Sequence, residues 1–114
     1  MQYEADRNSS ASGEPSLAEM TDKSIRILNK NKKGFYLHVE AGRIDHGHHS
    51  GNAYRALTDA MALSDAVAQA QSTLKELKLD KNTLIIVTAD HSHTFTIAGY
   101  PQRGNNILGK VIPF

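Results

Sequence analysis

Residues 83–93 read TLIIVTADHSH, an apolar β-branched run that passes directly into acidic and imidazole side chains. Such a run, without polar alternation, is typical of a strand buried on both faces of a sheet. The preceding segment, from about Asn52 to Leu79, has apolar side chains at helical spacing and no internal Gly or Pro, which predicts one long helix. Further back, residues 35–39 (FYLHV) end at Glu40 and predict a second strand. The predicted order is strand, helix, strand.

This order has a consequence for where the polar residues lie. A helical crossover makes the two strands parallel and almost always right-handed. Parallel strands end at the same edge of a sheet, and sites in open α/β sheets lie outside those carboxyl ends. Glu40 follows the first strand, and Asp90 and His91 follow the second. We therefore expect an α/β fold, part of an α/β/α sandwich with parallel strands, that brings the two polar segments together.

The rest of the chain is organised around this core. Residues 1–14 are polar and rich in Ser, Ala and Gly, so we expect a loop or linker there and a domain over residues 15–114. A helix is predicted to begin at Pro15-Ser16 and to continue through Leu28. Residues 95–98 favour a further short strand, and residues 102–114 favour a loop.

Composition excludes several function classes. The chain has 114 residues, with 13 Lys and Arg against 12 Asp and Glu, and a formal net charge of +1. This balance gives no electrostatic case for binding nucleic acid or an acidic membrane surface. No apolar run approaches the length of a bilayer span, and the first residues do not have the pattern of a secretory signal. The absence of cysteine excludes disulfides and thiolate metal ligands.

All six histidines lie between His38 and His93, interleaved with carboxylates. Asp45 and His49 are four residues apart, so both can reach one cation from a helical turn or a compact loop. Zinc accepts imidazole nitrogen and carboxylate oxygen together, and a further carboxylate such as Glu40 is the type of ligand that magnesium prefers. The pattern favours a site with mixed metal ligands.

Each residue taken alone also has a plainer interpretation. Single carboxylates often cap helices or form ion pairs, and His38 within a strand favours packing over metal binding. His48 and His93 alternate with stronger candidates and favour supporting or surface roles. Arg43 favours a structural ion pair over a phosphate contact. Ser92 beside His91 does not have the geometry of a nucleophile and its base. The convergence of two clusters on one sheet edge carries the metal hypothesis.

Two motifs resemble those of the alkaline phosphatase family. Residues 35–49, FYLHVEAGRIDHGHH, are similar to the family segment VEGGRIDHGHH, and residues 87–93 are similar to its TADHSH signature. Residues 53–58 and 99–104 continue the likeness, which covers about residues 15–110. Ala41 stands where the family usually has Gly. Because both motifs are long, ordered and correctly spaced, the resemblance is specific.

The resemblance implies a role for each matching position. It assigns Asp45 and His49 to one zinc, Asp90 and His91 to a second zinc, Glu40 to magnesium, and His46, Arg43 and His93 to places beside the metals or the phosphate. It also implies hydrolysis of phosphate monoesters through a phosphoserine intermediate, with two zinc ions clamping the attacking and leaving oxygens. The family's nucleophilic serine, its phosphate-binding arginine and the remaining ligands are not located in this chain. We therefore expect a fragment that, alone, binds zinc weakly and hydrolyses phosphate esters poorly or not at all.

Family membership further implies a homodimeric full-length enzyme that is exported to the periplasm or secreted. Three alternatives remain open at this point. The first is another enzyme of the phosphatase, sulfatase and phosphomutase superfamily, although the intact GRIDHGHH-like run argues against this. The second is a zinc-binding module without catalysis. The plainest alternative is an α/β domain with scattered histidines, in which zinc would leave stability unchanged.

Overall fold

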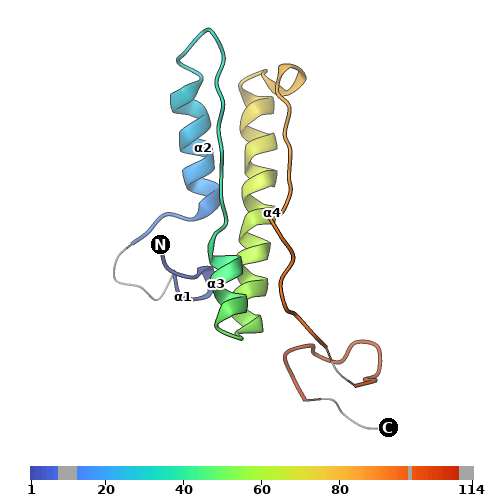
Figure 1. Ribbon diagram of the computed structural model, residues 1–114. Coiled ribbons are helices and arrows are strands. Elements are labelled where there is room, and N and C mark those ends of the chain that lie inside the picture. Colours follow the sequence, from blue (N-terminus) through green and yellow to red (C-terminus); the bar gives the residue numbers. More distant parts are fainter. Residues whose placement is uncertain (8–12, 98, 111–114) are drawn as a thin grey trace.

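The computed structural model describes residues 1–7, 13–97 and 99–110, and these residues form helices joined by extended segments and turns (Figure 1). The helices are α1 (Glu4–Arg7), α2 (Leu17–Leu28), α3 (Arg43–His49) and α4 (Ala53–Glu76), followed by the 3-10 turn η1 (Asp80–Asn82). The predicted helix after Pro15-Ser16 and the predicted long helix are both confirmed. Within residues 1–14, expected to be a loop or linker, residues 4–7 instead form the short helix α1, and residues 8–12 lie outside the described residues.

Helix α2 begins where the sequence supplies a complete cap. The Ser16 hydroxyl accepts from the backbone N–H of Glu19 at 3.2 Å, and the Glu19 carboxylate accepts from the backbone N–H of Ser16 at 2.7 Å. This reciprocal pair satisfies two N–H groups that a helix start otherwise leaves unpaired. The helix then buries Leu17, Thr21 and Ile25, which lie on one face, against α4.

The core lies between α2 and α4, which pack side by side (Figure 1). Ile25 is 2% exposed and Leu74 is 3% exposed, so each loses almost all contact with water. Burial of an aliphatic side chain of this size contributes about 1.5–3 kcal/mol. The apolar stripe predicted for the long helix is only partly right. Leu74 lies in the core, but Met61 is 67% exposed and Ala60 is also exposed, because α2 does not extend over that face.

A polar network joins the same two helices beside the core. The Thr73 hydroxyl donates to Oδ1 of Asp22 at 2.6 Å. Arg26 bridges the helices, with Nε 2.9 Å from Oδ1 of Asp22 and Nη2 2.6 Å from Oε2 of Glu76. The Thr73 hydroxyl is the main cause of the lowered pKa of Asp22, and the Arg26 guanidinium is the main cause of the lowered pKa of Glu76. These contacts fix the relative position of α2 and α4.

The predicted α/β fold is wrong for the described residues, because none of them lies in a strand or sheet. The two segments expected to be parallel strands have extended backbones and run in the same direction, one beside α2 and the other beside α4 (Figure 1). No backbone hydrogen bond joins them to each other or to another described segment. Residues 95–97 of the expected third strand are likewise outside any strand, and Ala98 is not described.

The physical reason is that a strand is defined by its neighbour. A β-branched apolar run sets an extended backbone, but a sheet also needs a second backbone about 4.8 Å away to complete the ladder of hydrogen bonds. The side chains of the second segment are also exposed rather than buried: Leu84 is 82%, Ile86 is 76% and Val87 is 59% exposed. The sequence pattern thus predicted the backbone conformation correctly and its partner incorrectly.

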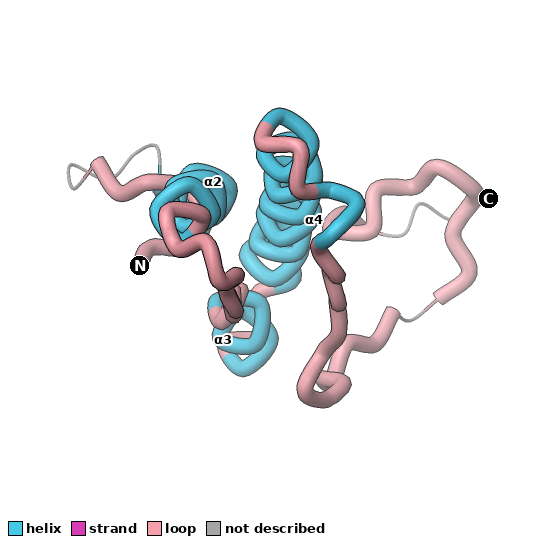
Figure 2. The backbone as a smooth tube through the Cα atoms, turned by 90° about the horizontal axis from the view of Figure 1, so that it is seen from above, coloured by secondary structure: helices cyan, strands magenta, loops and turns pink. Residues whose placement is uncertain are grey.

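Helix α3 packs across the first half of α4 and meets it at a very close contact. A Cβ atom placed on Gly47 would lie 2.7 Å from the backbone nitrogen of Ala56 and 2.9 Å from its Cα. Gly47 is buried and Ala56 is 1% exposed, so the two helices are closely packed at this point. In the view from above, α3 lies next to α4 (Figure 2). The described residues 102–110 form turns, as expected for a loop.

Candidate metal centre

Helix α3 carries the first pair of candidate ligands on one face. Asp45 and His49 are four residues apart, so helical geometry brings their side chains together. Oδ2 of Asp45 lies 3.4 Å from Nε2 of His49. The His49 side chain is 70% exposed and that of Asp45 is 38% exposed, which leaves the pair open to an ion from solvent.

The segment after the second extended run lies against this face of α3. Nε2 of His93 is 3.5 Å from Oδ1 of Asp45, and Nε2 of His91 is 3.9 Å from the same oxygen. The ligand atoms of Asp45, His49 and His93 all lie within 4.8 Å of one another. The two polar segments therefore do meet, as expected from the sequence, although no sheet edge brings them together.

Asp90 and His91 form a second pair with its own geometry. Oδ2 of Asp90 lies 3.3 Å from Nε2 of His91. The other ring nitrogen of His91, Nδ1, is 2.9 Å from the carbonyl oxygen of Ser92, and a carbonyl can only accept. Nδ1 therefore carries the proton, and the lone pair of neutral His91 is on Nε2. This contact to Ser92, followed by the charges of Asp90 and Asp45, raises the pKa of His91.

His93 has the opposite tautomer. The backbone N–H of Thr94 donates to Nδ1 of His93 at 2.8 Å, so Nδ1 holds the lone pair and Nε2 carries the proton in the neutral ring. The His93 side chain is 19% exposed, the least among the histidines that contact a carboxylate. Its ring stacks on His48 with centroids 4.8 Å apart and meets His49 edge-on at 4.7 Å. His93 is thus packed as a donor facing Asp45.

The donor spacings fit zinc. Two ligands on a tetrahedral zinc ion, each about 2.0–2.1 Å from the metal, are about 3.3 Å apart. The Asp45–His49 spacing of 3.4 Å and the Asp90–His91 spacing of 3.3 Å both match. In addition, Oδ1 of Asp45 is buried and makes no hydrogen bond. A buried carboxylate oxygen without a donor is costly unless a cation or another donor satisfies it.

Three other residues singled out in the sequence are not in the close group of Asp45, His49 and His93. Glu40 is exposed at the end of the first extended segment and is not among the mutually close ligand atoms of the described residues. His46 is exposed on α3. Arg43 uses its guanidinium within the protein, where Nε donates to the carbonyl of Met1 at 2.8 Å, which favours a structural role for it.

Sequence reasoning missed two features of the centre. It left α3 undefined as an element, because RIDHGHH contains a glycine and has little apolar periodicity. It also missed the aromatic packing of His48, which stacks on His93 and meets Phe95 edge-on at 5.5 Å. The alternation of His48 with the stronger candidates Asp45 and His49 was the available signal, but it did not reveal the distant partners.

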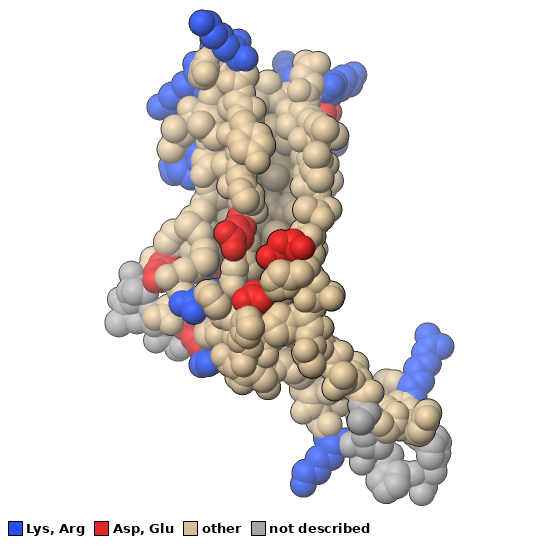
Figure 3. Space-filling model, viewed as in Figure 1, with Lys and Arg blue, Asp and Glu red and all other residues tan. Residues whose placement is uncertain are grey.

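The centre lies between an acidic surface and a cavity that no charged side chain lines. On the face shown in Figure 3, Asp and Glu side chains gather at the lower end of a hollow, and Lys and Arg side chains lie at the far ends of the long helices, at the lower left and toward the C-terminal end. A negative surface of this kind attracts cations. A cavity of about 360 Å³ lies beside the histidines, and His48 and Phe95 line both it and the cluster. No Asp, Glu, Lys or Arg lines this cavity.

Comparison with known proteins gives one consistent family. The family model described as alkaline phosphatase matches residues 1–112. The tissue-nonspecific alkaline phosphatase isozymes of Rattus norvegicus and Homo sapiens are 51% and 53% identical to the chain over 109 residues. The same isozyme of Gallus gallus is 52% identical. Each match covers 96% of this chain and 20% of the relative, so the chain spans about one fifth of the length of these proteins.

No solved structure gives a match to the chain. Among the described helices, none combines the length and the apolar character needed to cross a bilayer.

Proposed function

Because the chain belongs to the alkaline phosphatase family, we propose that it forms the metal-binding part of a phosphatase that hydrolyses phosphate monoesters. The observation that carries the proposal is the approach of residues 90–93 to α3, where carboxylate and imidazole atoms are spaced as zinc ligands are spaced. Two motifs distant in sequence thus contribute to one centre.

Two zinc ions are the proposed occupants, one for each matched pair. Asp45 and His49 would hold the first, and Asp90 and His91 the second. The tautomer of His91 supports this assignment, because its Nε2 lone pair faces Asp90 while Nδ1 is fixed by Ser92. When bound, zinc ions a few ångströms apart supply electrostatic stabilisation to the attacking and leaving oxygens of a phosphoryl transfer.

His93 is proposed to support the first zinc rather than to bind it. Its proton is on Nε2, which faces Oδ1 of Asp45 at 3.5 Å. Contacts at active sites often shorten when the site fills, so we expect this approach to become a hydrogen bond when Asp45 binds a cation. A donor on the outer oxygen of a carboxylate ligand fixes its orientation.

Glu40 and His46 have roles that depend on the family. Glu40 is proposed as a magnesium ligand, because a carboxylate is the ligand type that magnesium prefers and the family motif has its Glu at this position. His46 is exposed and is proposed to lie on the phosphate side of the centre. Neither residue belongs to the group of mutually close ligand atoms found among the described residues.

Several properties of the whole enzyme follow as part of the same proposal. The phosphoserine intermediate needs a nucleophilic serine that the two motifs do not contain. Ser92 lies next to His91, and the His91 ring nitrogen Nδ1 contacts the Ser92 carbonyl rather than its hydroxyl. The full-length enzyme is proposed to be an exported homodimer that acts on phosphate monoesters, since these properties accompany the family resemblance.

The alternative that keeps independent support is a zinc-binding module without catalysis. It is favoured by the exposed, preformed Asp45–His49 pair, which needs no other part of the enzyme.

An assay of the purified 114-residue chain measures the activity of this chain apart from that of the full-length enzyme. With zinc and magnesium present, we expect no turnover of p-nitrophenyl phosphate, because the motifs supply only part of a catalytic site.

A chimera tests the proposal itself. The matching 109 residues of the rat relative are replaced by this chain, and hydrolysis of p-nitrophenyl phosphate is measured. We expect activity that is lost with Asp90→Asn and kept with Asp80→Asn, a matched change in the turn η1. A folded chimera that binds zinc but is inactive, or one in which Asp90→Asn has no effect, contradicts the proposal.

A further inference from the structure

The first seven residues dock against the start of α3. The guanidinium groups of Arg43 and Arg55 both lie over the ring of Tyr3, with their carbons 4.9 Å and 4.6 Å from its centroid. Arg43 is the first residue of α3, and Arg55 belongs to the first turn of α4. A cation over an aromatic face contributes about 0.5–1 kcal/mol at an exposed site and more when desolvated. Tyr3 therefore links the two helices.

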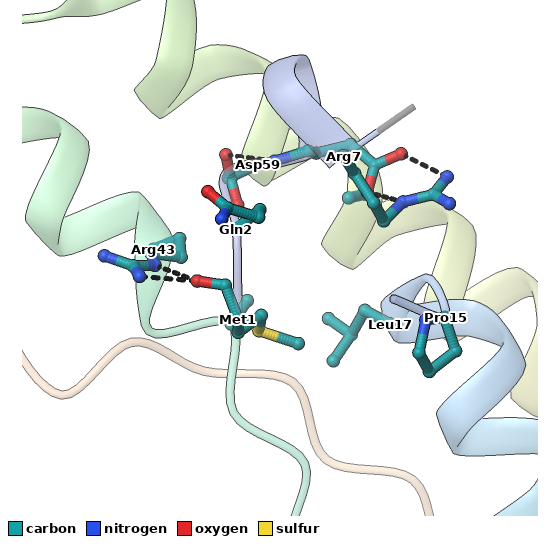
Figure 4. A pocket seen from close by; sticks show the side chains of 10 residues that line it. Met1, Gln2, Arg7, Pro15, Leu17, Arg43 and Asp59 are labelled. Atoms are coloured by element: carbon teal, nitrogen blue, oxygen red, sulfur yellow. Dashed lines mark hydrogen bonds and ion pairs between the residues drawn. The ribbon is translucent and has the colours of Figure 1, made fainter. Parts of the chain in front are cut away.

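Three polar contacts hold the segment in the same place. Nε of Arg43 donates to the carbonyl of Met1 at 2.8 Å, and Nη2 of Arg55 lies 2.8 Å from Oδ2 of Asp6. The carboxylate of Asp59 accepts from the backbone N–H of Glu4 at 3.2 Å (Figure 4). Asp59 is only 8% exposed, and burial raises its pKa. The contacts come from both sides of the junction between α3 and α4.

This junction does not form a ligand site. The cavity in Figure 4 measures about 20 Å³, and Met1, Leu17 and Arg43 are among the residues that line it. A space of this size has room for little more than one water molecule. The segment is packed onto the helices, so its contacts serve to place them.

Helix α3 needs such external support. It has seven residues, it contains Gly47, and its N-cap residue Gly42 makes no side-chain capping bond. Isolated helices shorter than about 12–15 residues are marginal in water, and an internal glycine weakens them further. The orientation of α3 must therefore come from what it contacts. Besides residues 91–93, those contacts include α4 at Gly47 and the N-terminal segment at Arg43.

We propose that Tyr3 is a positioning residue of the metal centre: by holding Arg43 and Arg55, it fixes the start of α3 and thereby the placement of Asp45 and His49. The inference rests on the proposed metal-binding function. Arg43 lies half a turn before Asp45, so a shift at the start of the helix moves this carboxylate directly. The N-terminal segment, far from the centre in sequence, becomes part of its framework.

The test compares three variants of the 114-residue chain with the wild type. Tyr3→Ala removes the ring, and Tyr3→Phe keeps the ring face without the hydroxyl. Tyr36→Ala is the matched control, because Tyr36 is 85% exposed. Cobalt(II), whose visible absorption reports ligand number and geometry, is titrated as a probe of the zinc site. Amide hydrogen exchange of α3 is measured separately without metal.

We expect Tyr3→Ala to weaken cobalt binding about ten-fold, as is found when outer supports of metal ligands are removed, and to speed exchange in α3 more than in α2. Tyr3→Phe should restore both properties, and Tyr36→Ala should leave both unchanged. If Tyr3→Ala matches Tyr36→Ala in either measurement, the inference is overturned. If the wild type binds no cobalt, the proposed function fails, and the metal-free exchange data alone decide whether Tyr3 holds α3.

Discussion

Nε2 of His93 lies 3.5 Å from Oδ1 of Asp45, while the other ring nitrogen of His93 accepts the backbone N–H of Thr94 at 2.8 Å. The contact with Thr94 determines whether His93 presents a donor or an acceptor to Asp45. With Nδ1 occupied by a donor, the neutral ring carries its proton on Nε2 and presents a donor, not a lone pair, to the carboxylate. Proximity alone would have made His93 a third ligand beside Asp45 and His49.

The tautomer of His93 gives the first prediction. Nitrogen-15 NMR of the zinc-loaded chain at pH 8 should show His93 protonated on Nε2 and His91 protonated on Nδ1. His93→Phe keeps an aromatic ring against His48 but removes the donor, and we expect it to weaken zinc binding by about ten-fold. An unprotonated Nε2 on His93 in the loaded chain would show that it is a ligand instead.

Asp45 gives the second prediction. Asp45→Asn keeps the shape of the side chain but removes its charge and one of its acceptor oxygens. We expect zinc affinity, measured by isothermal titration calorimetry, to fall by about 100-fold, more than the loss expected for an outer support. The control is Asp65→Asn, which changes an exposed carboxylate on α4 that is outside the metal group. Equal affinities for the two variants would exclude Asp45 as a ligand.

Gly47 gives the third prediction. Alanine is normally the better helix former, so helix propensity alone predicts that Gly47→Ala stabilises the chain by up to about 1 kcal/mol. Here the added methyl group would lie 2.7 Å from the backbone of Ala56, which a rotamer change cannot relieve. We expect the free energy of unfolding in urea to fall by about 2 kcal/mol. Ser64→Ala, at an exposed position of α4, is the control, and a rise in stability for Gly47→Ala would refute the close packing.

The network between α2 and α4 gives a prediction about pH. The pKa values of Asp22 and Glu76 are lowered from 3.8 and 4.5, chiefly by hydrogen bonds from Thr73 and Arg26 respectively. A carboxyl group whose pKa is lower in the folded state stabilises the fold above its unfolded pKa, and this contribution is lost as pH falls through the folded value. The melting temperature should therefore drop as pH falls below about 4.5.

Glu76→Gln isolates one part of this effect. The variant should melt below the wild type at pH 7, and the difference should shrink toward zero as the solution is acidified to about pH 3. Circular dichroism at 222 nm measures both melting curves. A difference that is constant over this range would mean that the Arg26–Glu76 contact does not contribute to stability through its charge.

The sequence predicted much of the helical structure because its signals are local. Ser16 and Glu19 form a cap within one turn, and the periodicity of residues 52–79 does not depend on any distant segment. Met61 was wrongly predicted to be part of the buried stripe, because the tertiary structure decides which face of α4 is covered by α2. The strands failed for a related reason, since residues 83–87 specify an extended backbone but do not specify its hydrogen-bonding neighbour.

In the candidate centre too, local features were predictable from the sequence and tertiary contacts were not. Asp45 and His49 lie close together, as their spacing indicates, because four residues on a helix place them side by side. The approach of residues 90–93 was anticipated for a different reason, the expected sheet edge. The opposite tautomers of His91 and His93 depend on Ser92 and Thr94 backbone groups, which no sequence pattern encodes. The docking of Tyr3 on Arg43 and Arg55 was likewise not visible in the sequence.

The most direct measurement is an anomalous-difference map at the zinc edge from crystals of the zinc-loaded chain. We expect two peaks, one within bonding distance of Asp45 and His49 and one within bonding distance of Asp90 and His91, with Nε2 of His93 pointing at the Asp45 carboxylate. A zinc ion bound elsewhere, or one that contacts α3 but has residues 90–93 turned away from it, would contradict the claim that these two segments form a single metal centre.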